Sequence, residues 1–177
     1  MESRDSTFSP ITDESIHRAL DLNNRHATEL SLLTLDGLKQ LIARASYARW
    51  CPGETGFLIA LDERADYPNP NFEWFRTRFA QFVYVDRVVV DEAHRGQGLA
   101  RRLYEDLFRT TDRALVVCEV NIVPPNPASD AFHARLGFSA VGSATLPDRQ
   151  KTVRYLCKRL DSCQAPPPCQ RSRSALP

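Results

Sequence analysis

The chain has 177 residues, of which 42% are hydrophobic and 25% charged, enough for one globular domain with its own core and short for two. A formal net charge of +1 lacks the concentrated basic excess of a nucleic-acid-binding face, so we expect no nucleic-acid partner. The apolar runs are shorter than a membrane span and the amino terminus lacks a signal-peptide core, so we expect no membrane partner.

The five cysteines are odd in number, and their spacing fits neither a zinc site nor a disulfide framework. Three of them stand in apolar, strand-like contexts, where buried reduced thiols are the usual state. We therefore expect a cytoplasmic protein without a metal site.

The amino-terminal part of the chain contains two predicted helices. Residues 1–10 have no periodicity and are expected to be loose or, at most, a short edge strand. The first helix begins near Thr12 and ends at Asn23 and Asn24, which either face a substrate cleft or cap the helix. Thr34 begins the second helix, whose apolar stripe is expected in the core and consists of Leu35, Leu38, Leu41, Ile42 and Ala45.

A hairpin and an irregular excursion follow. Residues 46–51 and 55–61 are predicted to form two strands joined by a Pro-Gly turn. Residues 62–78 are rich in Pro and Asn, which break regular structure, but they also carry several large aromatic side chains. This excursion is predicted to be either a lid or binding loop, or an apolar cluster folded over the sheet.

The central stretch joins an apolar strand at 81–90 to a helix through a polar turn. Gly96 and Gly98 lie in that turn, and a residue without a Cβ lets a phosphate approach the main chain. Backbone N–H groups at the start of a helix have no internal partner, and the helix N-terminus carries roughly half a positive charge. Arg95 and Arg101 add full charges. The turn is therefore predicted to cradle a pyrophosphate, with an ordinary β–α turn as the alternative.

Residues 114–121 are predicted to form another buried strand. Its alternation places Glu119 on one face with Val117 and Asn121, and Cys118 on the other. A carboxylate in such a run is unusual, because an unpaired buried charge costs several kcal/mol. Glu119 is therefore a candidate functional residue.

The last predicted helix begins at Asn126 as its cap and Pro127 as its first residue. Two further strands, 138–146 and 152–160, close the domain around a turn at 147–149. The predicted order is helix, helix, hairpin, strand, helix, strand, helix, strand, strand.

Three blocks of this sequence resemble the GNAT superfamily of N-acetyltransferases, and they occur in the same order. Arg95-x-x-Gly98-x-Ala100 follows a strand, as does the similar coenzyme A signature Arg/Gln-x-x-Gly-x-Gly/Ala of that family. The strand with Glu119 comes next. Asn126 and the twelve residues after it then resemble the family's Asn-x-x-Ala-x-x-x-Tyr-x-x-x-Gly-Phe. The whole pattern is similar to a subgroup of predicted acetyltransferases without an assigned substrate.

The resemblance implies one α/β (α+β) domain over residues 11–160. Its central mixed sheet would have about six to seven strands, flanked by about four helices. Residues 1–10 would then be a loose amino terminus, and residues 161–177, rich in Pro and Ser, a disordered tail. Either a monomer or a homodimer is compatible with this organisation.

The resemblance also implies acetyl-CoA as the cosubstrate. The pantetheine arm would pair with the strand backbone, the pyrophosphate would lie on the glycine-containing turn, and Asn126 would contact the coenzyme or cap its helix. The expected cofactor-binding positions are Val88, Val89, Val90, Arg95, Gly96, Gln97, Gly98, Leu99, Ala100, Arg101 and Asn126.

Four residues are candidates for the chemistry that the resemblance implies: Glu119, Asp86, His133 and Tyr84. Glu119 is the first candidate base, unless it pairs with Arg87 or another strand charge. Asp86 is the second, and in a regular strand it shares a face with Tyr84, Val88 and Val90, although an Asp86–Arg87 pair is the structural alternative. His133 stands where many members carry a tyrosine acid; it is expected either to donate a proton or to pack on the helix surface or the cofactor.

The predicted function is direct transfer of an acetyl group from acetyl-CoA to a primary amine, without a covalent enzyme intermediate. The acceptor could be a small molecule, a protein N-terminus or a lysine. The alternative is a non-catalytic module that binds coenzyme A or acyl-CoA as a sensor or scaffold.

Overall fold

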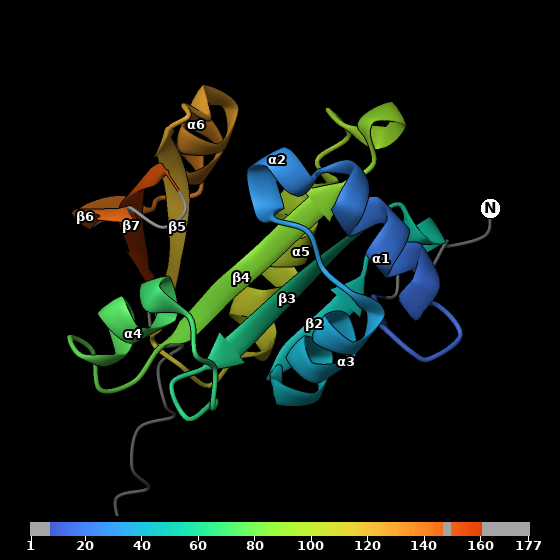
Figure 1. Cartoon of the computed structure of the whole chain (residues 1–177), viewed down its shortest axis with the longest axis horizontal. Coiled ribbons are helices and arrows are strands. Elements are labelled where there is room, and N and C mark those ends of the chain that lie inside the picture. Colours follow the sequence, from blue (N-terminus) through green and yellow to red (C-terminus); the bar gives the residue numbers. More distant parts are fainter. Residues whose placement is uncertain (1–7, 147–149, 161–177) are drawn as a thin grey trace, which may run out of the picture.

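The computed structural model describes residues 8–146 and 150–160, and its centre is one mixed sheet of seven strands in the order β1-β2-β3-β4-β5-β7-β6 (Figure 1). The strands are β1 (Ser9–Pro10), β2 (Tyr47–Trp50), β3 (Gly56–Asp62), β4 (Val83–Val90), β5 (Leu115–Val123), β6 (Ser139–Leu146) and β7 (Lys151–Arg159). The helices are α1 (Ile16–Arg25), α2 (Ala27–Leu30), α3 (Leu35–Arg44), α4 (Pro70–Arg76), α5 (Leu99–Thr110) and α6 (Pro127–Arg135). The fold class and the strand count agree with the sequence prediction, and α2 and α4 are two short helices beyond the four expected.

The pairing between β4 and β5 ends early. These two strands are parallel and pair at only two positions in the described structure, Val83 with Val116 and Tyr84 with Val117. On its other side, β4 pairs with β3 along its whole length, from Val83 to Val90. Figure 1 shows that β4 and β5 diverge beyond the pairing region. We call the resulting gap the split; it leaves one edge of β4 and one edge of β5 without a strand partner.

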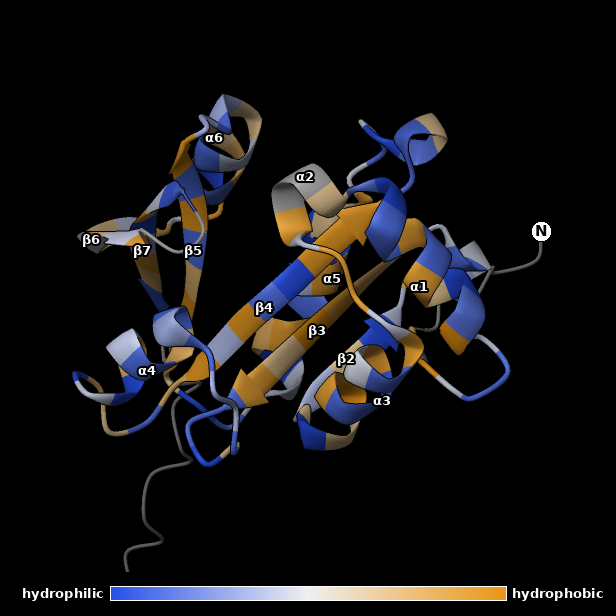
Figure 2. Cartoon of the chain, viewed as in Figure 1, coloured by the Kyte–Doolittle hydropathy of each residue, from blue (hydrophilic) through white to orange (hydrophobic). Residues whose placement is uncertain are grey.

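A bulge interrupts β4 beside the split. Val85 pairs with Ala60 and Arg87 pairs with Ile59, so Asp86 is an extra residue in the ladder. Figure 2 shows a hydrophilic band in the middle of β4, where the sequence has Asp86 and Arg87. A bulge shifts the side-chain alternation by one residue. The prediction of a regular strand face shared by Asp86 with Tyr84, Val88 and Val90 is therefore wrong.

The two faces of the sheet have separate apolar cores. Helices α1, α3 and α4 cover one face, and α5 and α6 cover the other (Figure 1). Strand β3 is buried on both faces because Phe57 and Ile59 belong to the first core and Leu58 and Ala60 to the second. Around Asp86, Tyr84 packs in the first core, whereas Val88 and Val90 pack against the second.

Three helices begin at side-chain caps. Thr34 accepts a hydrogen bond from the Gly37 backbone N–H and starts α3, as predicted. Asn126 accepts from the Ser129 N–H and starts α6, also as predicted. Asn69 accepts from two backbone N–H groups and starts α4, with a proline at the first helical position. The expectation that residues 62–78 lack regular structure is therefore wrong.

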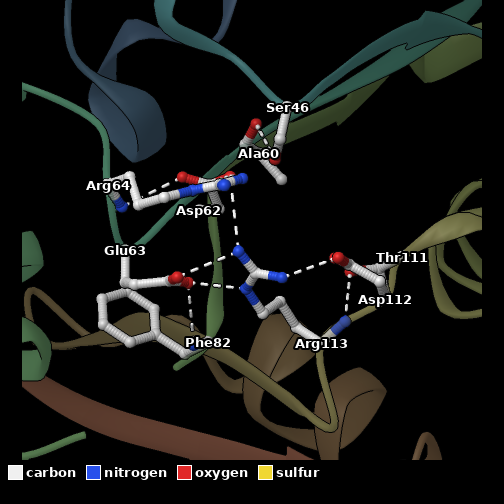
Figure 3. A network of polar contacts seen from close by, with 9 residues as sticks. All are labelled: Ser46, Ala60, Asp62, Glu63, Arg64, Phe82, Thr111, Asp112 and Arg113. Carbon is white, nitrogen blue, oxygen red and sulfur yellow. Dashed lines mark hydrogen bonds and ion pairs between the residues drawn. The ribbon is translucent and has the colours of Figure 1, made fainter. Parts of the chain in front are cut away.

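An ion-pair network holds the end of the sheet where β4 and β5 do pair (Figure 3). Arg113, just before β5, donates to Glu63, just after β3, with Nε–Oε2 and Nη2–Oε1 distances of 2.7 and 2.9 Å. Glu63 also accepts from the Phe82 backbone N–H, next to the start of β4. Arg113 and Glu63 together therefore join the ends of β3, β4 and β5, at the end of the sheet opposite the opening of the split.

Several predictions fall on residues outside the described ranges. They concern most of the loose amino terminus at 1–10, the turn at 147–149 and the tail at 161–177. Ser9 and Pro10 pair with β2 as a two-residue edge strand. Within the described ranges, no helix is long and apolar enough to cross a membrane, and Cys51, Cys118 and Cys157 are free thiols.

Candidate active site

A cavity of about 320 Å³ lies at the split and is lined by residues from both diverging strands. Val88 and Val90 of β4 and Val120 of β5 give it an apolar wall on the side of α5. Asp86 and Glu119 give it an acidic lining elsewhere. The cavity therefore joins a surface suited to a long apolar arm with buried carboxyl groups.

The turn at 95–101 lies at the open end of β4 and leads into α5. Gly96 and Gly98 have positive φ angles of 78° and 73°, and no heavy atom lies within 4 Å of the position that a Cβ would take at either residue. In the described structure, the backbone N–H groups of residues 96–101 have no acceptor. A second cavity of about 360 Å³ faces these residues. Open space in front of unpaired donors at a helix N-terminus fits a phosphate group.

The side chains of this turn take different directions. Arg95 donates to the Val90 carbonyl oxygen at 3.4 Å, and its Nη2 lies 3.1 Å from Nδ1 of His26, between α1 and α2. Arg101 pairs with Glu105 at 2.7 Å on the exposed side of α5. Leu99 is buried in the core, so only its backbone N–H is available. Ala100 lines both cavities.

Asn126 caps α6 by accepting from the Ser129 N–H at 3.1 Å, and it also lines the cavity at the split. Both roles expected of this residue are therefore compatible with its position.

Glu119 projects from β5 with its two carboxylate oxygens in different surroundings. Its Oε1 accepts from Asn71 Nδ2 at 2.9 Å and from the Tyr84 hydroxyl at 3.1 Å. Its Oε2 is buried and has no hydrogen-bond partner among the described residues. Burial, and then the charge of Asp86, raise the pKa of Glu119 to about 7, although hydrogen bonds from Tyr84 and Asn71 oppose the rise. The predicted alternative, an ion pair with Arg87, does not occur.

Asp86 has both oxygens engaged. Its Oδ1 accepts from the Tyr67 hydroxyl at 2.6 Å, and its Oδ2 accepts from Arg87 Nε at 2.7 Å. The guanidinium of Arg87 also donates to Asn23 Oδ1 at 2.6 Å, which brings the end of α1 to the site. The Asp86 and Arg87 side chains are 3% and 5% exposed. Asp86 therefore has the geometry of the predicted structural pair, and Glu119 is the carboxylate with a free oxygen.

His133 lies on α6 with both ring nitrogens engaged. Its Nδ1 lies 2.8 Å from the Ser129 carbonyl oxygen, which can only accept, so Nδ1 carries the proton. Its Nε2 therefore accepts from the Tyr104 hydroxyl, also at 2.8 Å. Burial lowers the pKa of His133. A neutral imidazole held in this way is a poor proton donor to a ligand.

Sequence reasoning missed three residues around this site. Tyr104 of α5 lines the cavity and binds His133. Asn71 of α4 binds Glu119, and the Tyr155 hydroxyl of β7 donates to Asn71 Oδ1 at 3.0 Å. The Asn69–Pro70 pair is the sequence signal for this helix, because the same Asn-Pro pattern at Asn126 and Pro127 predicts a helix start. Only the folded structure brings these residues together.

No group of three or more His, Cys, Asp or Glu side chains in the described part of the chain is arranged to hold a metal ion.

Comparisons with solved structures find the same fold in other proteins. Ard1 from Thermoplasma volcanium has a TM-score of 0.69 and 14% identity, over 88% of this chain and 97% of its own. The putative acetyltransferase yncA from Salmonella typhimurium, solved with acetyl-CoA, has a TM-score of 0.63 and 21% identity, over 93% and 99%. A chain of the NatC complex, solved with Gag peptide and CoA, has a TM-score of 0.67 and 13% identity, over 88% and 98%. The TM-scores show that the chain shares the fold of these proteins.

The sequence comparisons give the family. A search of curated proteins found no match. The family model described as "Acetyltransferase (GNAT) family" matches residues 41–138, more than half of the chain. That range contains the split, the turn at 95–101 and Glu119. The chain therefore belongs to the GNAT family of acetyltransferases, acyl-transferring enzymes that use acetyl-CoA as cosubstrate.

Proposed function

We propose that this protein transfers the acetyl group of acetyl-CoA directly to a primary amine. The observation that carries the proposal is the position of Glu119 Oε2, a buried oxygen without a partner among the described residues, at a cavity between two diverging strands. The acceptor classes that fit are a small-molecule amine, a protein N-terminus and a lysine.

The chain offers two sets of backbone groups for binding. The N–H groups of residues 96–101 would hold the pyrophosphate at the start of α5. The edge of β4 at Val88–Val90 would pair with the pantetheine arm, because β5 has already diverged from it there. Acetyl-CoA supplies the acetyl group as a thioester, whose carbonyl carbon accepts an amine nucleophile.

Glu119 would act as the general base. Primary amines have reference pKa values of about 8 to 10, so near neutral pH the acceptor arrives mainly as an ammonium ion. Because its pKa is about 7, Glu119 is ionised above neutrality and can still hold a proton once it has accepted one. Its Oε2 would take the ammonium proton and leave a nucleophilic amine.

We assign no acid to the leaving group. Thiols have a reference pKa of about 8.5, so the C–S bond can break with release of a thiolate and without a donor from the protein. The second proton of the attacking nitrogen then passes to that thiolate or to water as the amide forms. His133 and Tyr104 engage each other, and burial lowers the pKa of His133. Their role would be to shape the cavity wall on which they lie.

Acetyl transfer is tested by thiol release from acetyl-CoA with a panel of amines, with the products checked by mass spectrometry. The panel contains small primary amines, a peptide with a free N-terminus, and a blocked peptide with one lysine. Transfer to at least one class is expected, with a rate that rises as the pH increases through about 7. Coenzyme A binding without transfer to any amine would instead favour the sensor or scaffold function.

A pair of glycine variants tests the binding site. Gly98→Glu should weaken coenzyme A binding by about 100-fold or more, because a carboxylate would face the pyrophosphate. Gly53→Glu is the matched control, since Gly53 also has a positive φ (79°) but lines neither cavity. Unchanged affinity in Gly98→Glu, measured by calorimetry, would count against the phosphate assignment.

A further inference from the structure

The helix α4 contributes a buried amide to the proposed active site. Asn71 is 4% exposed and donates from Nδ2 to Glu119 Oε1, across the space between the β3–β4 connection and β5. We propose that Asn71 is a positioning residue that holds the Glu119 carboxyl group in one orientation, with Oε2 presented to the acceptor amine. This inference rests on the proposed function and adds to it the residue that orients the base.

The orientation of the Asn71 amide is itself fixed. The Tyr155 hydroxyl donates to Asn71 Oδ1 at 3.0 Å, which turns Nδ2 toward Glu119. The opposite amide orientation would place Oδ1 against the carboxylate oxygen, and two acceptors repel each other there. Tyr155, Asn71 and Glu119 therefore form a directed chain of hydrogen bonds from β7 to β5.

Packing holds α4 in place on both sides of the split. On the side of β4, the Phe72 ring meets Tyr84 edge to face at 5.6 Å. On the side of β7, Trp74 stacks on Tyr155 at 4.1 Å. The helix that carries the Asn71 amide is thus anchored to β4 and to β7. The amide can therefore fix the position of the Glu119 carboxyl group on β5.

The two oxygens of Glu119 are unequal as a result. Oε1 accepts from both Asn71 and Tyr84, whereas Oε2 has no partner among the described residues. Without Asn71 the carboxyl group could rotate, and its anion would lose a donor. Both effects act on proton transfer and leave the 95–101 turn unchanged.

Other groups also face Glu119 and contribute to its titration. The charge of Asp86 raises the pKa of Glu119, and the Tyr84 hydroxyl lowers it. Asp86 is paired with Arg87, which limits its effect. The groups in the electrostatic surroundings of Glu119 are Tyr84 and Asp86 on β4, Tyr104 on α5, Cys118 on β5 and Tyr155 on β7.

Three variants test the chain of hydrogen bonds through the pH dependence of kcat. Asn71→Ala should move the acidic limb upward by about one pH unit and reduce kcat near pH 7 by about fivefold, with KM for acetyl-CoA unchanged. Tyr155→Phe keeps the ring stack on Trp74 and should give a smaller shift in the same direction. The double variant should match Asn71→Ala within about twofold, because Tyr155 acts through Asn71.

Glu73→Ala, an exposed change on the same helix, is the control and should keep the wild-type profile. A titration of the Glu119 carboxyl carbon by NMR supplies a readout without turnover, and Asn71→Ala should raise its midpoint. An unchanged profile and midpoint in folded Asn71→Ala, or additive effects in the double variant, would overturn the positioning role while leaving acetyl transfer intact. If the wild type acetylates no amine but the midpoint shifts, the proposed function fails and the hydrogen-bond chain stands.

Discussion

At the scale of single residues, the fold holds the Glu119 carboxyl group in surroundings that disfavour its ionised form. Burial and the neighbouring Asp86 raise its pKa from 4.5 to about 7. The folded protein therefore binds this proton more tightly than the unfolded chain does. Stability associated with the protonated group is fully present below about pH 4.5 and is lost as the pH rises through 7. The same shift that suits a base near neutral pH thus destabilises the fold above it.

Glu119→Gln should consequently stabilise the protein increasingly with pH. The free energy of unfolding of the variant minus that of wild type should be larger by about 2 kcal/mol at pH 8 than at pH 5, because only wild type loses stability as Glu119 ionises. Urea denaturation at the two pH values measures this difference, and Glu73→Gln, on the exposed side of α4, is the control. In activity assays the variant should lose most near neutral pH and less near the pKa of the amine. A stability difference independent of pH would show that the folded protein does not disfavour the ionised form of Glu119.

The residues of the site differ in how far they could be predicted. Glu119 follows from strand alternation, because β5 is regular between Leu115 and Asn121. The predicted face shared by Asp86, Tyr84, Val88 and Val90 is wrong for the two valines, because a bulge has no reliable signal in one sequence. Asn71 and Tyr155 lie 48 and 36 residues from Glu119 in the chain, and no local sequence pattern links either residue to Glu119.

At the scale of elements, α4 links the first core to the site, because it carries both Phe72 and Phe75 and the Asn71 amide that binds Glu119. The expected apolar cluster over the sheet is present, since Phe72 and Phe75 are fully buried in the first core. The prediction takes Pro and Asn as breakers of regular structure and therefore lacks this helix, although Asn69 caps it and Pro70 occupies the first helical position. The glycine at 142 on β6 faces Trp74 and makes room for its indole ring.

Gly142→Ala tests how firmly α4 is held. A Cβ at this position would lie 2.6 Å from Trp74 Cζ2, and the ring cannot retreat easily because it stacks on Tyr155. We expect a loss of about 1–3 kcal/mol in the free energy of unfolding and a lower kcat, since Asn71 moves with the helix. Combining the change with Trp74→Phe should cost less than the sum of the two single changes. Ser143→Ala, at the next and exposed position, is the control. Equal losses in Gly142→Ala and Ser143→Ala would contradict this packing argument.

At the scale of the molecule, the sheet is closed at one end and open at the other. The Arg113 network joins the ends of β3, β4 and β5, and the two-position pairing of β4 with β5 lies beside it. The order of elements and the motif at 95–101 were sufficient to predict the family fold. The split could be expected only through that resemblance, because hydrophobic patterns reveal strands but not which of their edges stay unpaired.

Ligand binding should therefore stabilise the open end selectively. Coenzyme A at 100 times its Kd should raise the free energy of unfolding by about 2.7 kcal/mol, seen as a higher Tm. Hydrogen exchange should slow most at residues 96–101 and at the β4 amides that face the split, because their N–H groups gain acceptors. Amides near Arg113 lie at the end where the strands are already joined, so their exchange rates should change little. Gly98→Glu should abolish the local slowing. Protection concentrated at the Arg113 end would mean that the coenzyme binds elsewhere than the split.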